Sequence, residues 1–144
     1  MAERAIEVRK DLAEAPEDVF AFLTDAERYA KWMGRAAELD ARPGGIYRVE
    51  MDSQTVALGE YVTVDPPHRL VFTWGWVGNP DVPPGSTTVE IELTPTEDGT
   101  TLVLRHTGLP DGETTAMHRE GWELYLERLA LAASGGTPPP IPHP

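Results

Sequence analysis

Residues 59–76 read GEYVTVDPPHRLVFTWGW, a stretch that predicts two antiparallel strands joined by a tight turn at 65–67. Side chains alternate between the two faces of a strand. One face of the second strand therefore carries a row of bulky apolar residues, namely Leu70, Phe72, Trp74 and Trp76. Such a row either fills a core or forms the wall of a pocket, and the alternation alone is compatible with both.

The segments around this hairpin show the same period of two residues. An opening strand is predicted over about 4–12, and further strands follow one another from about 35 to 107. The connections between these later strands are too short for helical crossovers. The pattern therefore predicts an antiparallel meander.

Three helices are predicted outside the strands. Pro16 suits the first turn of a short helix. Thr24 and Glu27 form a capping-box pattern that opens a second short helix, which Gly34 is expected to end. A long helix over about 114–133 has apolar residues at helical intervals.

These elements predict one α+β domain over residues 1–134, in which the long helix covers the apolar face of the sheet. The length of 144 residues also suits a single domain. Residues 135–144 read GGTPPPIPHP and predict a disordered tail.

Composition excludes several classes of function. The net charge of −12 argues against binding to nucleic acid or to an anionic membrane surface. The chain has no cysteine, so disulfides, thiolate catalysis and cysteine metal sites are excluded. No run approaches the ~20 apolar residues of a membrane span, and the first residues lack the apolar core of a signal peptide. We therefore expect a soluble cytoplasmic protein without membrane insertion.

Five segments, taken in order, match a known family: APEDVFAFLTDAERYAKWM, ARPGGIYRVEM, GEYVTVDPPHRLVFTW, GTTLVLRHTGLP and MHREGWELYLERL. The specific part is the ordered combination of Gly44-Gly45, the turn at 65–67, His106-Thr107-Gly108 and Gly121-Trp122. On these motifs the chain resembles the START/birch-pollen-allergen-like (SRPBCC) superfamily. Within it, the chain resembles the branch named after the activator of the heat-shock protein 90 ATPase.

The resemblance implies the helix-grip fold: a curved antiparallel sheet wrapped around the long C-terminal helix, with two short helices after the first strand. It also implies an apolar cavity between sheet and helix. Some relatives bind lipids, hormones or polyketide intermediates, some are cyclases or hydrolases, and many bacterial members have no assigned activity. The fold therefore does not identify the ligand.

Candidate ligand-binding residues follow if each strand keeps its apolar side inward. They are Trp32, Tyr47, Met51, Tyr61, Phe72, Trp74, Trp76, His106, Met117, Trp122 and Tyr125. The competing interpretation of the same residues is a dry, filled core.

Acid–base candidates are few. His106 ends an apolar alternation, so it is predicted to point inward near the mouth of the cavity, as a general base, a ligand contact or a hydrogen-bonded structural histidine. His118 lies either at the cavity entrance or on the surface. If Gly59 marks a bulge, either Glu60 or Tyr61 turns inward, and the pattern does not choose between them.

No metal motif and no glycine-rich phosphate loop are present, so no metal and no cofactor are predicted, and no residue is assigned as catalytic. The leading hypothesis is a soluble binding domain for a small hydrophobic or amphipathic ligand. The alternatives are a polyketide cyclase-like or hydrolase-like enzyme that uses the same cavity through His106 or Glu60, and a chaperone-interacting module. Homodimerisation is a further interaction that the family allows.

Overall fold

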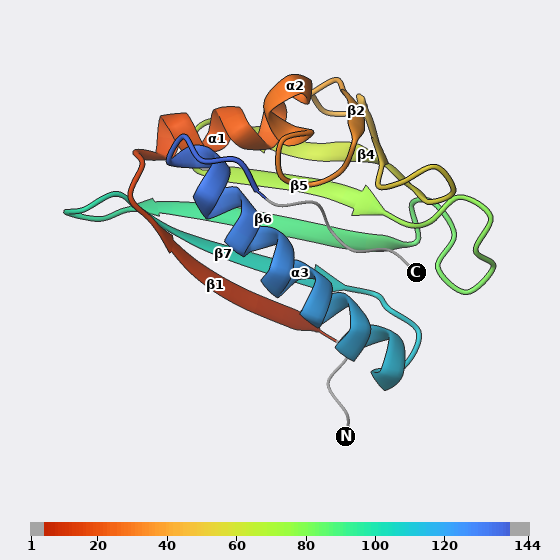
Figure 1. Cartoon of the computed structure of the whole chain (residues 1–144). Coiled ribbons are helices and arrows are strands. Elements are labelled where there is room, and N and C mark those ends of the chain that lie inside the picture. Colours follow the sequence, from red (N-terminus) through yellow and green to blue (C-terminus); the bar gives the residue numbers. More distant parts are fainter. Residues whose placement is uncertain (1–4, 139–144) are drawn as a thin grey trace.

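The computed structural model describes residues 5–138. The elements in this range are β1 (Ile6–Leu12), α1 (Pro16–Thr24), α2 (Ala26–Tyr29), β2 (Ala36–Leu39), β3 (Ile46–Glu50), β4 (Val56–Asp65), β5 (Arg69–Trp74), β6 (Thr87–Pro95), β7 (Thr100–Thr107) and α3 (Gly112–Ala133). The seven strands of the described range form one curved antiparallel sheet in the order β1-β7-β6-β5-β4-β3-β2 (Figure 1). Strands β2 to β7 are the predicted meander, and β1 pairs with β7 at one edge. The predicted α+β helix-grip fold is confirmed.

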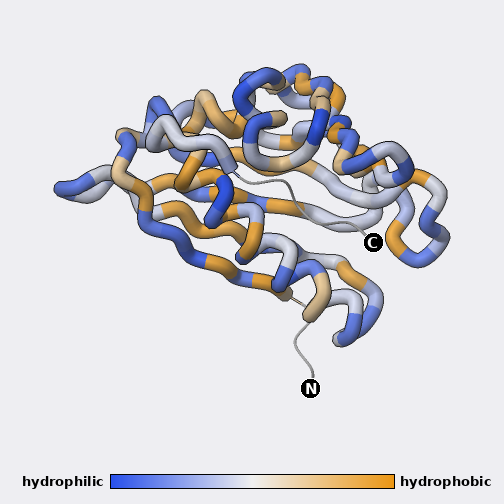
Figure 2. Tube along the Cα trace, in the orientation of Figure 1, coloured by the Kyte–Doolittle hydropathy of each residue, from blue (hydrophilic) through white to orange (hydrophobic). Residues whose placement is uncertain are grey.

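Helix α3 lies across one face of this sheet (Figure 1). Its N-terminus is capped by Asp111, whose Oδ1 accepts the backbone N–H of Thr114 at 2.7 Å, so the helix begins at Gly112 rather than at about Thr114. The side chains of α3 that are buried include Trp122, Leu126, Leu129 and Ala132. Figure 2 shows hydrophobic and hydrophilic residues alternating along the strands beneath the helix. The core therefore lies between the helix and the sheet, as the period of two predicts.

The cap of the second short helix differs from the prediction. Oδ1 of Asp25 accepts the backbone N–H groups of Glu27 at 3.0 Å and Arg28 at 3.2 Å, so Asp25 is the cap. Thr24 is the last residue of α1, and its Oγ1 donates to the carbonyl oxygen of Phe20 at 2.9 Å. A threonine that bonds back into its own helix cannot cap the next one. The prediction of a capping box that begins at Thr24 is therefore wrong.

The second short helix is also shorter than predicted. It ends at Tyr29, and residues 30–33 form turns instead of continuing to Gly34. A Cβ atom at Gly34 would lie 2.6 Å from the carbonyl oxygen of Glu50, the same oxygen that accepts the backbone N–H of Arg35 at 2.9 Å. Gly34 is thus required by the close approach to β3, and it does not end a helix.

The hairpin of β4 and β5 decides which of two neighbouring residues points inward. The pairing is irregular between Tyr61 and Thr63, not at Gly59. As a result Tyr61 is buried, with 1% of its surface exposed, and Glu60 is exposed. A Cβ atom at Gly59 would collide with the carbonyl oxygen of Thr73, so this glycine permits close strand pairing and is not the site of the bulge.

The last part of the chain is described only as far as Pro138. Most of the predicted disordered tail, residues 139–144, therefore lies outside the described residues. Among residues 5–138, no helix combines the length and apolarity needed to cross a bilayer.

Candidate functional site

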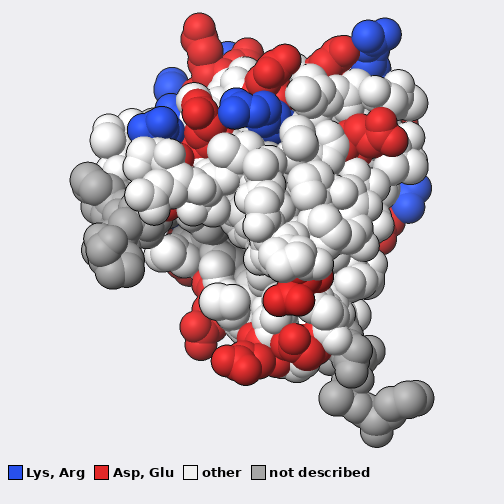
Figure 3. Space-filling model, turned by 90° about the vertical axis from the view of Figure 1, so that its right-hand side faces the viewer, with Lys and Arg blue, Asp and Glu red and all other residues white. Residues whose placement is uncertain are grey.

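An open cleft of about 1140 Å³ lies beside the N-terminal half of α3. Its walls come from the β3–β4 loop, from the end of β5 with the residues that follow it, from α3, and from Met33 in the connection between α2 and β2. The apolar side chains that line it are Met33, Met51, Trp74, Trp76, Val77, Pro80, Met117, Trp122 and Tyr125. The polar ones are Asp52, Gln54, Thr55, Asn79, His118 and Glu120. Figure 3 looks onto this end of the molecule.

Aromatic rings form a continuous wall in the cleft. The ring centroids of Trp74 and Trp76 are 5.1 Å apart, and those of Trp74 and Trp122 are 5.2 Å apart. Trp74 and Trp122 are almost fully buried, whereas Trp76 and Tyr125 are half-buried. The two inner rings therefore form the base of the wall, and the two outer ones remain available for contact.

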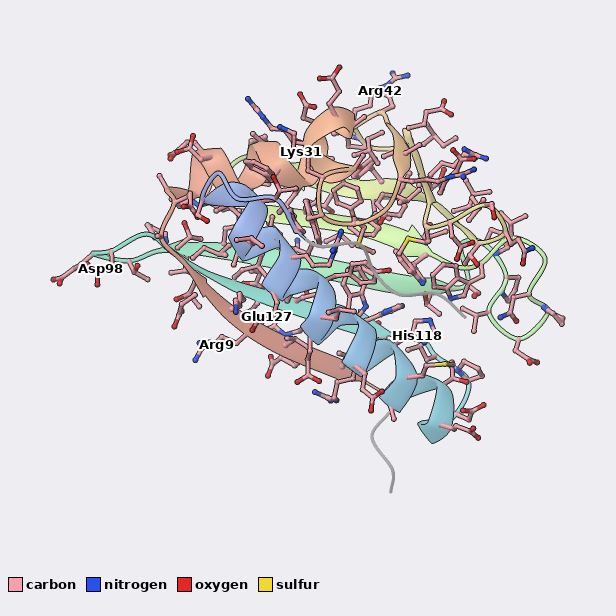
Figure 4. The ribbon with its side chains drawn as sticks, viewed as in Figure 1. Arg9, Lys31, Arg42, Asp98, His118 and Glu127 are labelled. Atoms are coloured by element: carbon pink, nitrogen blue, oxygen red, sulfur yellow. The ribbon has the colours of Figure 1, made fainter. Side chains whose placement is uncertain are left out.

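The outer ring of Trp76 is fixed from across the cleft. Its Nε1–H donates to Nε2 of His118 at 2.9 Å, and Nδ1 of His118 lies 2.8 Å from the carbonyl oxygen of Thr114. Figure 4 labels His118 on α3. An indole N–H can only donate, so Nε2 of His118 is the acceptor and the proton is on Nδ1. Burial lowers the pKa of His118, although its bond to Thr114 acts in the opposite direction. His118 is thus a neutral tether for Trp76.

His106 belongs to a buried chain of hydrogen bonds. Trp122 donates Nε1–H to Nδ1 of His106 at 3.0 Å, and Nε2 of His106 bonds Oγ1 of Thr87 at 2.8 Å. Thr87 in turn donates to the carbonyl oxygen of Trp74 at 2.8 Å. Burial, with a smaller contribution from His118, lowers the pKa of His106 to about 3. Both ring nitrogens are occupied by the core.

Comparison with protein families identifies the chain. A family model described as Activator of Hsp90 ATPase homolog 1-like protein matches residues 14–133. The chain belongs to this family. A comparison with curated proteins found no match.

Solved structures resemble this AHSA1-like domain closely. The AHSA1-like protein RHE_CH02687 of Rhizobium etli is 44% identical with a TM-score of 0.76, over 94% of this chain and 85% of that one. DynU16, a protein of the dynemicin biosynthetic locus, is 27% identical with a TM-score of 0.83 over 95% of this chain, which spans only 49% of DynU16. The Aha1 protein of Colwellia psychrerythraea, solved as a dimer, is 17% identical with a TM-score of 0.76, over 90% of this chain and 95% of that one. The last likeness concerns the fold alone.

The predicted site residues of this AHSA1-like domain fall into two groups, according to whether they line the cleft. Those that line the cleft are Met51, Trp74, Trp76, Met117, Trp122 and Tyr125. Those that are buried in the core and do not themselves line the cleft are Trp32, Tyr47, Tyr61, Phe72 and His106. His106 points inward as expected, but it is fully buried and not at the mouth.

Packing around the short helices explains why Trp32, Tyr47 and Phe72 of the second group are in the core. The ring of Tyr47 stacks on Phe72 with centroids 4.1 Å apart, and its hydroxyl lies 2.6 Å from that of Tyr29 at the end of α2. Trp32, three residues beyond Tyr29, donates Nε1–H to the carbonyl oxygen of Phe22 at 3.0 Å. These contacts hold the rings of Trp32, Tyr47 and Phe72 in the core beside the short helices.

In the two loops of the cleft, the sequence prediction named Met51 and Trp76 but none of the other lining residues as ligand-binding, because loops have no periodicity. A sequence signal for both loops is an Asp or Asn whose side-chain oxygen accepts backbone N–H groups two and three residues later. Oδ1 of Asp52 accepts the N–H groups of Gln54 and Thr55, each at 2.8 Å. Likewise, Oδ1 of Asn79 accepts the backbone N–H groups of Asp81 and Val82. Such turns order a loop and make it usable as a wall.

The charged residues of the lining are acidic. Asp52 and Glu120 contribute carboxylates, while no Lys or Arg is among the lining residues of the described chain. In Figure 3 acidic side chains gather at the lower part of this face, with no basic ones among them. Within residues 5–138, no three His, Asp or Glu side chains converge as a metal site would require.

Proposed function

We propose that this AHSA1-like domain binds a small apolar or amphipathic molecule in the cleft between α3 and the loops that follow β3 and β5. The observation that carries the proposal is the aromatic lining, in which Trp76 and Tyr125 are only half-buried. A volume of about 1140 Å³ suits a molecule of drug or lipid size.

The methionines of the lining support this proposal. Met33, Met51 and Met117 all line the cleft, and together with Met1 they account for the four methionines of the chain. Methionine is flexible and polarisable, so it adapts to ligands of different shape. Met117 is 62% exposed and Met33 is 1% exposed, which places adaptable side chains at both the rim and the base.

The enzymatic alternative has weaker support. Its two acid–base candidates, His106 and Glu60, are not among the cleft residues. His106 has both nitrogens engaged in the core, and Glu60 faces solvent. A general acid or base must reach the reacting group within hydrogen-bond distance or through one water. Binding without chemistry is therefore the function that we favour.

Titration with the neutral apolar dye N-phenyl-1-naphthylamine tests the proposal. We expect saturable binding with a fluorescence increase. Trp76→Ala should weaken binding about fivefold to tenfold, because an aromatic contact contributes roughly 1–1.4 kcal/mol. Val62→Ala is the matched control, because Val62 is 50% exposed and outside the cleft. Absence of saturable binding to the wild type, or equal losses in the two variants, would contradict the proposal.

A further inference from the structure

We propose that the indole N–H of Trp74 is the hydrogen-bond donor that the cleft offers to its ligand, so that the ligand is an apolar molecule with a carbonyl oxygen at its inner end. This inference rests on the proposed binding function and concerns the polar group of the ligand. It comes from three observations on this side chain: its lack of a partner, the bonding of the polar groups around it, and its position in the cleft.

Trp74 differs from the other three tryptophans of the chain in its hydrogen bonding. The indole N–H groups of Trp32, Trp76 and Trp122 each donate a hydrogen bond within the protein, over distances of 3.0, 2.9 and 3.0 Å. Nε1 of Trp74 is buried, yet it has no hydrogen-bond partner among residues 5–138. A buried indole N–H normally finds a partner, because an unpaired buried donor costs more free energy than one hydrogen bond usually contributes.

The polar side chains beside Trp74 are bonded to other groups. The ring centroid of His106 is 5.8 Å from that of Trp74, and both nitrogens of His106 take part in hydrogen bonds in the core. The ring centroid of Tyr47 is 5.9 Å away, and its hydroxyl is paired with that of Tyr29. Among the described residues, the core therefore surrounds the ring of Trp74 without supplying an acceptor for its N–H.

The position of Trp74 places this donor at the base of the cleft. Trp74 is one of the lining residues, although only 2% of its surface is exposed. The centroids of two other lining rings, Trp76 and Trp122, lie 5.1 and 5.2 Å from its own. A ligand that packs against these rings therefore brings its inner end to Trp74.

The Nε1 atom is covered, so a lining side chain has to move before a ligand atom reaches it. Met33 and Met51 line the same cleft and are 1% and 9% exposed. Methionine is unbranched and has three rotatable bonds, so it adapts its conformation readily. Flexible side chains at the base allow the cleft to uncover the donor when a ligand enters.

The chemistry of the donor determines the group that it binds. An indole nitrogen donates and does not accept, so the ligand must supply the lone pair. The carbonyl oxygen of a ketone, ester or amide does so without bringing a charge into the core. A hydrocarbon leaves the donor unpaired. A site with a buried polar group discriminates strongly against an analogue that cannot bond it.

Two probes of nearly the same shape test the inference. The ketone 2-acetylnaphthalene and the alkene 2-isopropenylnaphthalene differ in a C=O that becomes C=CH2, and each competes with N-phenyl-1-naphthylamine. Replacing Trp74 by β-(3-benzothienyl)alanine keeps the size of the ring and removes the N–H. We expect this replacement to weaken the ketone at least fivefold and the alkene less than twofold, because only the ketone loses a hydrogen bond.

The same replacement at Trp32 is the matched control. Trp32 lies outside the cleft lining, and its N–H donates to the carbonyl oxygen of Phe22. We expect the control to lower the melting temperature without changing the ratio of the ketone and alkene affinities. The replacement at Trp74 should leave the melting temperature of the free protein unchanged, because its N–H has no partner there to lose.

Nuclear magnetic resonance of the wild type observes the donor directly. Four tryptophans give four indole N–H resonances, and the one that is absent from the benzothienyl variant belongs to Trp74. The two probes share the same naphthalene ring, so a difference between their complexes reports on the oxygen. We expect the proton of Trp74 to lie downfield in the ketone complex relative to the alkene complex, as hydrogen bonding to the carbonyl requires.

The outcomes separate the two proposals. Saturable dye binding with equal losses for the ketone and the alkene in the Trp74 variant overturns the role of the donor and leaves the binding function standing. Identical positions of the Trp74 resonance in the two complexes overturn it as well. Failure of the wild type to bind the dye overturns both proposals.

Discussion

Trp122 donates its indole N–H to Nδ1 of His106 at 3.0 Å, and this bond joins the centre of α3 to the end of β7. Because Nδ1 accepts, the single proton of the neutral ring must be on Nε2, where it faces Oγ1 of Thr87. A second proton would have to be placed on Nδ1, opposite an N–H group and inside the core. The helix–sheet contact therefore requires a neutral His106.

His106 should lower the stability as the pH falls from 7.5 to 5.5. The pKa of His106 is about 3 in the folded protein, while an unfolded histidine titrates near 6.5, so only the unfolded state binds the proton in this range. Linkage then lowers the free energy of unfolding by about 1.4 kcal/mol for this one residue. Urea unfolding at the two pH values should show that His106→Gln loses about 1.4 kcal/mol less than the wild type. The control His68→Gln replaces an exposed histidine, and it should lose as much as the wild type. Identical losses in all three proteins would contradict the neutral His106.

Acid should also weaken dye binding through His118. Its pKa is lowered by burial, so protonation begins below pH 6.5, and the added proton on Nε2 removes the acceptor for Trp76. We expect the affinity for N-phenyl-1-naphthylamine to fall severalfold between pH 7.5 and 4.5. His118→Gln keeps an acceptor that does not titrate, so it should retain a flat profile over this range. A decrease of equal size in the variant would assign the effect to other groups.

The buried hydroxyl pair of Tyr29 and Tyr47 should contribute to stability and not to binding. Their oxygens are 2.6 Å apart and lie in the core. Tyr47→Phe leaves the hydroxyl of Tyr29 without this partner, which should cost about 1–3 kcal/mol in urea unfolding. The double replacement of both tyrosines by phenylalanine should recover part of that loss, because neither hydroxyl then remains buried. Dye affinity should stay within twofold of the wild type, and a tenfold loss would mean that the cleft extends to Tyr47.

Gly75 should tolerate no side chain. A Cβ atom there would collide with the carbonyl oxygen of Pro83, where the chain after β5 runs back beside itself. Gly75→Ala should therefore destabilise the protein by roughly 2 kcal/mol or more and weaken dye binding, since Trp76 follows directly. Gly112→Ala is the matched control, because a Cβ atom at Gly112 would meet nothing within 4 Å. Thermal melts that shift equally for both variants would contradict this account.

Much of the fold follows from local patterns in the chain. The period of two along β3 to β7 predicts both the strands and their inward faces, because successive side chains of a strand must point to opposite sides. The errors lie where two local signals compete. Thr24 and Asp25 are both suitable caps, and which of them caps α2 depends on where α1 ends.

The sequence did not predict which aromatic residues lie in the core and which line the cleft. Phe72, Trp74 and Trp76 alternate along one segment of chain, yet they lie in the core, at the base of the cleft and at its rim, respectively. The alternation determines the face on which a side chain lies. The depth of that side chain depends on what packs above it, which is α2 with its flanking turn at one end and α3 with two loops at the other.

The sequence by itself thus determined the order of the elements, the antiparallel sheet and the apolar face that the long helix covers, since these depend on neighbours a few residues apart. Only the tertiary structure decided that His106 is hydrogen-bonded within the core and that His118 accepts the hydrogen bond that holds Trp76. These two hydrogen bonds join residues that are 16 and 42 positions apart in the sequence. Their geometry exists only once the helix is packed on the sheet.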